Sequence, residues 1–251
     1  MNDLPSVGIL AAFTVFSRIG TCLMFMPGLS SPRIPVQARL FVAIALSLAI
    51  TPLIYDVLRP ALIGVDPAGL LRLMGSELLI GALIGLMGRV FFVGLETLGM
   101  AMSFAIGLTS NLGAPVNEDE PLPAIATVLT LGATALMFLT DLHLEVFKAL
   151  AASYTNVPIG GGYAAQSGVV QLVDMTGRAF MISLRIVSPF LVFSVLVNFA
   201  VGLTNRLVPN VQVFFLSSPF LILGGLTLLY VTVKPLLQAF INTFGQFLVS
   251  G

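Results

Sequence analysis

The chain has 251 residues, of which 57% are hydrophobic and 9% are charged, and its mean hydropathy is +1.06. A soluble domain carries about a quarter charged residues, so this composition excludes a water-exposed globular surface and predicts a polytopic membrane protein. The formal net charge is zero and there is no basic run, which excludes nucleic acid as a partner. Cys22 is the only cysteine, so no intrachain disulfide can form and a small buried hydrophobe is expected there.

The N-terminal part of the chain begins with two predicted membrane spans. Residues 7–27 are an apolar stretch interrupted by Arg18, and because no positive n-region precedes them, the stretch is expected to be retained rather than cleaved. Prolines end it and predict a stiff connection over residues 28–37. Residues 40–55 are the second predicted span. Residues 56–66 contain proline, glycine and aspartate and are predicted to be a short polar loop.

A third predicted helix covers residues 68–93, and residues 94–108 continue it with a Gly- and Met-rich sequence. Gly81 and Gly85 are four residues apart, so they lie on one face of this helix, one turn from each other. Two small residues at this spacing allow helix backbones to approach closely in a membrane. The sequence therefore predicts that Gly81 and Gly85 pack against another helix.

The most unusual stretch is residues 110–121, which hold two prolines, a glycine and three consecutive acids. A polar, irregular backbone between apolar spans is tolerated only in water or lining a protein cavity. We therefore treat the stretch as a candidate pore element, with an ordinary exposed loop as the alternative that the residues leave open. Its members are Ser110, Asn111, Leu112, Gly113, Ala114, Pro115, Val116, Asn117, Glu118, Asp119, Glu120 and Pro121.

Downstream of this loop, apolar and mixed segments alternate. Residues 122–140 form an uncharged predicted span, and residues 141–155 are mixed enough to lie at an interface. Residues 156–162 contain a proline and three glycines and are predicted to be a loop. Residues 169–178 are amphipathic and lead into the last part of the chain.

A long helical hairpin, residues 179–234, is predicted near the C-terminus. Its uncharged stretches, residues 186–205 and 207–233, each match the about 20 apolar residues that a helix needs to cross a bilayer. An apolar tail follows. The residues expected at the turn, where the hairpin also contacts a neighbouring subunit, are Asn205, Arg206 and Pro209.

Six charges lie inside or at the edge of the apolar spans: Arg18, Arg72, Glu77, Arg89, Glu96 and Arg206. An ionised group in hydrocarbon costs at least about 2.5–3.5 kcal/mol, so these side chains are expected to face protein or water. Arg72 with Glu77, and Arg89 with Glu96, are predicted as buried ion pairs. Salt bridges between helices or subunits are favoured over the alternative, an ion or proton route.

No catalytic, metal or cofactor site is expected. His143 is the only histidine, and neither cysteines nor carboxylates surround it at metal-ligand spacing. The three glycines at residues 160–162 lack the Lys-Ser/Thr that would follow in a phosphate loop. No Ser-His-Asp arrangement and no pair of catalytic carboxylates can be argued, so the chain is predicted not to be an enzyme.

Several groups of residues along nearly the whole chain resemble one family. They are Pro27-Gly-Leu-Ser, Arg33-Ile-Pro35 and Arg39-Leu40 near the N-terminus, Gly99 and Gly107 before the polar loop, and Asp141-Leu-His143-Leu, Val157-Pro-Ile-Gly160 and residues 202–214 with Pro219 in the C-terminal half. The most specific part is the Asn-Arg-x-x-Pro segment at residues 205–209. On these residues the chain resembles the FliR family of flagellar export-gate proteins and their counterparts in type III secretion injectisomes.

The resemblance implies an all-helical subunit, built of kinked hairpins, in the bacterial inner membrane and the flagellar basal body. The implied partners are lipid and FliP-like, FliQ-like and FlhB-like subunits, and unfolded flagellar proteins would pass through the shared pore. In this family the loop matching residues 110–121 would lie in that pore as a plug. No cofactor is implied.

Residues and resemblance together predict an all-α protein of about six or seven kinked helices arranged as hairpins. We expect one export-gate domain, residues 1–251, with N-terminal helices over 1–109, the polar loop 110–121 and C-terminal helices over 122–251. The predicted function is a structural, pore-forming subunit of the flagellar protein export gate. The alternatives are an injectisome export-gate subunit and a secondary transporter with broken helices around mid-membrane charges.

Overall fold

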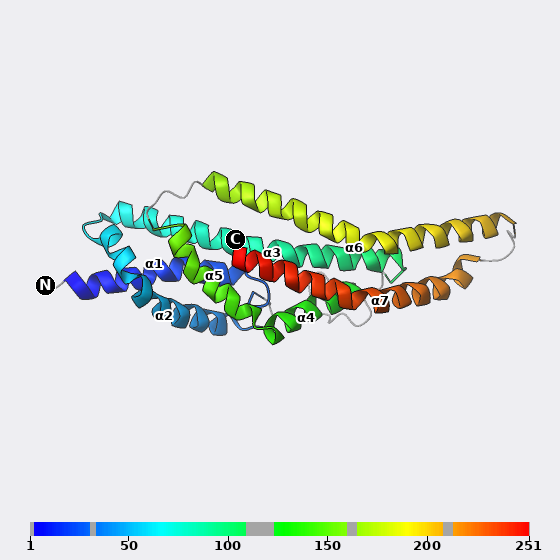
Figure 1. The fold of residues 1–251 in the computed structure, drawn as a ribbon, viewed down its shortest axis with the longest axis horizontal. Helices are drawn as coiled ribbons and strands as arrows, with labels where there is room; N and C mark the ends of the chain where they lie inside the picture. The colour runs from blue at the N-terminus through cyan, green and yellow to red at the C-terminus, as the bar shows by residue number, and fades with distance from the viewer. Residues whose placement is uncertain (1–2, 31–33, 109–122, 160–164, 208–212, 251) are drawn as a thin grey trace. The chain divides into compact units, whose positions relative to one another are not determined.

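Figure 1 shows the computed structural model, which describes residues 3–30, 34–108, 123–159, 165–207 and 213–250. Over these ranges the chain is built of helices and contains no strand, which confirms the predicted all-α class. The seven helices are α1 (Asp3–Phe25), α2 (Val36–Leu62), α3 (Pro67–Ala105), α4 (Ala124–Leu139), α5 (Leu142–Asn156), α6 (Ala165–Leu207) and α7 (Val213–Ser250).

Five of these helices are long and apolar enough to cross a membrane: α1, α2, α3, α6 and α7. The shorter helices α4 and α5 pass the same test only as a pair, which is bent by 72° between them. A helix satisfies its own backbone hydrogen bonds, so it is the structure that apolar segments of this length adopt in lipid. The number of helices agrees with the six or seven predicted.

Helix α2 is longer than the sequence indicated. Residues 56–62 were predicted to belong to a polar loop, but α2 continues to Leu62 with Pro52 and Pro60 inside it. A proline removes one helical hydrogen bond, whereas leaving the helix in an apolar setting would expose several backbone groups at once. The connection to α3 is therefore short, and it contains Gly64 with a left-handed φ of 75°.

The C-terminal helices also exceed the predicted hairpin. The lead-in at residues 169–178 is part of α6, which runs for 43 residues through Pro189. The apolar tail is part of α7, which runs for 38 residues through Pro219 and Pro235. Pro189 and Pro219 lie inside the predicted spans, and Pro235, which was expected to follow the hairpin, is also accommodated within α7, as in many membrane helices.

Contacts within the chain define two compact units, each made of separate segments, whereas the sequence indicated one domain divided at residues 110 and 121. Unit 1 comprises Met1–Val90, Met137–Thr176 and Phe244–Gly251, and unit 2 comprises Phe91–Leu136 and Gly177–Thr243. Helices α3, α6 and α7 each contribute residues to both units.

Helix α1 is the most buried of the membrane-length helices, and its core residues belong to unit 1. Ala11, Val15, Ile19 and Cys22 have no exposed surface. In unit 2, the rings of Phe92 on α3 and Phe240 on α7 meet edge to face with centroids 5.1 Å apart. Offset and edge-to-face geometry is the preferred arrangement of aromatic side chains.

Long apolar faces remain uncovered on α2, α6 and α7. Phe41 on α2 is 69% exposed, Phe199 on α6 is 66% exposed and Tyr230 on α7 is 83% exposed. Only 11% of the most apolar window of α6 is buried within the chain. Apolar surface of this extent requires lipid or other protein against it.

Candidate functional site

The centre of unit 1 is an ion pair between α1 and α3. The guanidinium of Arg18 donates from Nε to Oε2 of Glu77 at 2.6 Å and from Nη2 to Oε1 at 3.0 Å. Both side chains have zero exposed surface. This two-bonded fork is the strongest geometry available to an arginine and a carboxylate, and it neutralises both charges inside an apolar core.

The same guanidinium also holds the C-terminal end of α5. Its Nη1 donates to Oγ of Ser153 at 3.1 Å, and its Nη2 donates to the carbonyl of Val157 at 3.1 Å. A cation at this position satisfies carbonyls that a helix end leaves without partners and interacts favourably with the helix dipole. The guanidinium carbon lies 4.1 Å from the ring centroid of Tyr154, which adds a cation–π contact.

The partner predicted for the buried carboxylate of Glu77 was wrong. Glu77 pairs with Arg18, not with Arg72, whose side chain is exposed. Glu77 is five positions after Arg72, so on an ideal helix the two side chains point about 140° apart. Arg89 is exposed and Glu96 is half-buried in this chain, and because the predicted salt bridges include bridges between subunits, the burial of this pair stays a prediction.

Small residues of α3 bring it against α1 at the level of the ion pair. A Cβ added to Gly81 would overlap the backbone of Arg18, and one added to Gly85 would lie 2.7 Å from the carbonyl oxygen of Cys22. The face predicted from the spacing of the two glycines therefore contacts α1. The close approach of α1 and α3 also brings the carboxylate of Glu77 within reach of the guanidinium of Arg18.

In unit 2, two close contacts involve residues that precede and follow the predicted pore loop in the sequence. A Cβ on Gly99 of α3 would overlap the backbone of Ala126 on α4, and one on Gly225 of α7 would overlap Ile106. Ile106 follows the end of α3 and is fully buried. The predicted loop residues Ser110–Pro121 lie outside the described residues, so the structure tests neither their conformation nor their role.

The predicted turn of the C-terminal hairpin is only partly described. Asn205 and Arg206 belong to the last turn of α6, which ends at Leu207, so the prediction that they form the turn itself is wrong. Both side chains are exposed and are accessible to a neighbouring molecule. Pro209 lies outside the described residues.

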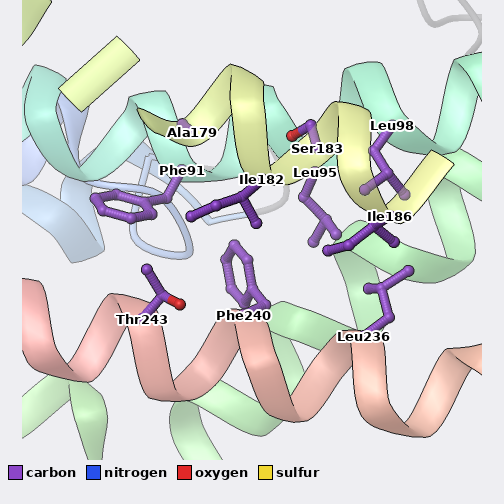
Figure 2. A pocket seen from close by; sticks show the side chains of 10 residues that line it. All are labelled: Phe91, Leu95, Leu98, Ala179, Ile182, Ser183, Ile186, Leu236, Phe240 and Thr243. Atoms are coloured by element: carbon purple, nitrogen blue, oxygen red, sulfur yellow. The ribbon is translucent and has the colours of Figure 1, made fainter. Parts of the chain in front are cut away.

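Unit 2 contains a small apolar pocket between α3, α6 and α7. Figure 2 shows Phe240 pointing from α7 toward Ile182 on α6. The pocket has a volume of about 40 Å³. The hydroxyl of Ser183, in the wall of the pocket, donates to the carbonyl of Gly94 at 3.2 Å. A space this small and this apolar is a packing gap between helices rather than a substrate site.

No group of three His, Cys, Asp or Glu side chains that could hold a metal ion occurs among the residues that the structure describes. His143, at the start of α5, packs with its ring centroid 5.2 Å from that of Phe138. The residues that sequence reasoning missed are Ser153, Tyr154 and Val157 around Arg18. Their sequence carries no signal of this role, because their meeting with Arg18 depends on how α5 packs against α1.

The chain matches the family model described as bacterial export proteins, family 1, over residues 9–247. It is 29% identical to flagellar biosynthetic protein FliR of Caulobacter vibrioides, with 96% of this chain and 95% of the relative covered. It is 24% identical to flagellar biosynthetic protein FliR of Escherichia coli K12, over 89% of this chain and 84% of the relative. It is also 27% identical to Yop proteins translocation protein T of Yersinia pestis, over 86% of this chain and 83% of the relative.

Proposed function

The chain belongs to the bacterial export proteins, family 1, and from this membership we propose that it is a structural, pore-forming subunit of the flagellar protein export gate. In this function unfolded flagellar proteins cross the inner membrane through a pore to which the chain contributes. The observation that carries the proposal is the match over residues 9–247, together with the nearly full-length similarity to a flagellar biosynthetic protein.

The uncovered apolar helices support an assembled subunit over a chain that acts alone. Much of α6 is not covered by any other part of the chain. Its exposed residues include Arg178, Arg185 and Arg206, together with large apolar side chains. Arginines in apolar surroundings require polar or charged partners. We expect FliP-like, FliQ-like and FlhB-like subunits to supply part of that cover, and lipid to supply the rest.

Residues 110–121 are proposed as the element that closes the pore. The support comes from their sequence, since two prolines and three consecutive acids are incompatible with lipid. The helices that precede and follow these residues in the sequence, α3 and α4, pack closely together at Gly99 and Ala126. We expect the energy for transport to come from elsewhere, because the sequence contains no nucleotide-binding loop.

Co-purification tests the proposal directly. The chain is produced with FliP-like and FliQ-like subunits from the same bacterium, and each subunit is tagged in turn. The expected result is one stable complex that contains all of them, and deletion of the gene is expected to abolish secretion of flagellar proteins. A monodisperse single chain that takes up a small solute in proteoliposomes would instead establish the secondary transporter.

An injectisome subunit is the second candidate, and the 27% identity to Yop proteins translocation protein T favours it. The two candidates share the architecture of the gate and differ in what the gate exports. A deletion strain separates them, because a flagellar subunit is required for motility, whereas an injectisome subunit is required for secretion by a motile cell.

A further inference from the structure

An uncovered seam of residues runs along the C-terminal part of α6. Successive members are three, four, three, four and three positions apart, so they line up on one side of the helix. This is the spacing that places side chains between two helices that wrap around each other. Every member of the seam is exposed in the chain. The members are Ser188, Leu191, Val195, Asn198, Gly202 and Asn205.

A different face of α6 already packs within unit 2. The ring of Phe193 lies where a side chain on Gly224 of α7 would be, and Ser183 donates to the carbonyl of Gly94 on α3. Phe193 is five positions before Asn198, so on an ideal helix the two side chains point about 140° apart. The packing of Phe193 against α7 therefore leaves the seam uncovered.

The side chains of the seam are of the kinds found between helices in an apolar environment. Ser188 and Gly202 are small, and small residues let two helix backbones approach closely. Gly202 has nothing within 4 Å of its Cβ position, so the space beside it is open in the chain. An alanine at this position would still be small and would preserve this property. Leu191 and Val195 supply exposed apolar surface to the seam.

Asn198 indicates that protein rather than lipid covers the seam. It lies inside the uncharged stretch of residues 186–205, eight positions or about 12 Å before Arg206. An arginine can extend to lipid headgroups, but the short side chain of Asn198 cannot. Its amide donates to Oγ of Ser194 at 3.2 Å, which leaves one N–H and the carbonyl oxygen to be satisfied. Acyl chains offer no hydrogen-bonding group, so the partner of Asn198 is a polar side chain on another helix.

The charges beside the seam indicate what kind of helix this is. From Arg178 to its end at Leu207, α6 contains three arginines and no acidic residue. A second copy of α6 would therefore bring only arginines to the seam, and like charges in apolar surroundings repel each other strongly. A carboxylate forms the charge-assisted hydrogen bonds that a guanidinium requires there. The complementary helix is apolar, with a hydrogen-bonding side chain opposite Asn198 and an acidic residue near Arg206.

We propose that the seam of α6 binds such a helix from another subunit of the export gate. Asn198 is hydrogen-bonded between the two helices, and this polar contact fixes their register, because any shift leaves the carboxamide without a partner. Arg206 meets the acidic residue of the partner at the end of the contact. The inference rests on the proposed function, since it requires that the chain assembles with other subunits.

Two cysteine variants test whether the seam is covered. Val195 belongs to the seam, whereas the neighbouring Leu196 points about 100° away, and the two residues are 67% and 63% exposed. Each is replaced by cysteine in a Cys22→Ala background. Alkylation by N-ethylmaleimide is then compared in the chain alone and in its complex with FliP-like and FliQ-like subunits. On assembly, alkylation of Val195→Cys should slow by about fivefold or more, and alkylation of Leu196→Cys should slow much less.

Asn198→Leu tests the hydrogen bond with little change in side-chain size. Because Asn198 is exposed, the variant chain alone should unfold at the same temperature as the unmodified chain. The yield of complex recovered through a tagged FliP-like subunit should fall by about threefold or more. Asn198→Gln keeps the carboxamide and should retain most of the yield.

Several results would overturn the proposal. Equally fast alkylation of Val195→Cys in the chain and in the complex would show that lipid or detergent covers the seam. Equal slowing of the two cysteine variants, a disulfide between two Val195→Cys chains, or a normal yield of complex with Asn198→Leu would also contradict it. If the unmodified chain forms no complex at all, the proposed function fails too, and this result is distinct from the others.

Discussion

Arg18 of α1 and Glu77 of α3 are 59 residues apart in the chain, and their side chains form two hydrogen bonds, of 2.6 and 3.0 Å, with no exposed surface. Taking two charges out of water is expensive, and only near-ideal geometry with further hydrogen bonds offsets the cost. Arg18 has that geometry, because it also donates to Ser153 and to the carbonyl of Val157. The pair therefore ties three helices of unit 1 together at one point.

Arg18→Met should destabilise the protein by about 3–5 kcal/mol, because it leaves the carboxylate of Glu77 buried without its partner. Cys22 is the only cysteine and is fully buried, so a thiol-reactive dye reports unfolding directly. The dye should react at a markedly lower temperature in Arg18→Met. Combining Arg18→Met with Glu77→Leu should restore much of the loss, and equal stability of the single variant and the unmodified chain would refute the role of the pair.

An exposed pair provides the control for this experiment. Lys148 and Glu145 are 2.7 Å apart on the surface of α5. Surface pairs contribute about 0–1 kcal/mol, so Lys148→Ala should leave the unfolding temperature nearly unchanged.

Gly81→Ala should destabilise the chain by about 1–3 kcal/mol, because the added methyl group meets the backbone of Arg18 and cannot be accommodated by a side-chain rotation. Gly75→Ala on the same helix is the matched control, since nothing lies within 4 Å of its Cβ position. That control should be neutral or slightly stabilising. The unfolding temperatures of Gly81→Ala and Gly75→Ala are measured with the thiol-reactive dye that reports exposure of Cys22. Equal unfolding temperatures of the two variants would contradict the close contact of α1 and α3.

Gly225→Ala should reduce both stability and export. The new Cβ would overlap Ile106, which is fully buried just after the end of α3, so α7 and α3 must separate. We expect a loss of about 1–3 kcal/mol in stability and a fall in secreted flagellar protein. Gly202→Ala on α6, where the Cβ position has no neighbour within 4 Å, should leave both unchanged. Normal secretion by Gly225→Ala at normal protein levels would show that this contact is dispensable.

Deletion of residues 110–121 should open the gate. If the segment closes the pore, cells with the shortened chain should leak ions and small solutes even when nothing is exported, while the complex still assembles. Membrane potential and uptake of a small dye measure the leak. A deletion that leaves both the leak and export unaltered would refute the closing role.

Arg206→Ala should weaken assembly, because this exposed arginine at the end of α6 is proposed to contact a neighbouring subunit. The yield of complex recovered through a tagged FliP-like subunit is the readout. Arg206→Lys keeps the charge and should retain more of the complex than Arg206→Ala. Full assembly and secretion by Arg206→Ala would show that the residue has no such contact.

Much of the architecture could be predicted from the chain alone. Few charges and long apolar runs indicate membrane helices, because lipid leaves the backbone almost no alternative. The positions of Gly81 and Gly85 indicated which face of α3 packs closely, because helical periodicity places them together. Helix ends were predicted less well, since Pro60 and Pro235 lie within helices, although residues 56–66 were predicted to be a loop and the hairpin was predicted to end at residue 234.

Composition and hydropathy by themselves determined that this is an all-helical membrane protein, because lipid leaves the backbone of an apolar segment almost no alternative to a helix. The tertiary structure alone decided that Glu77 meets Arg18 and not Arg72, and that the end of α5 lies on the same guanidinium. Such pairings depend on the rotation and register of helices distant in sequence. Local periodicity constrains neither of these, and the packing of the whole unit determines both.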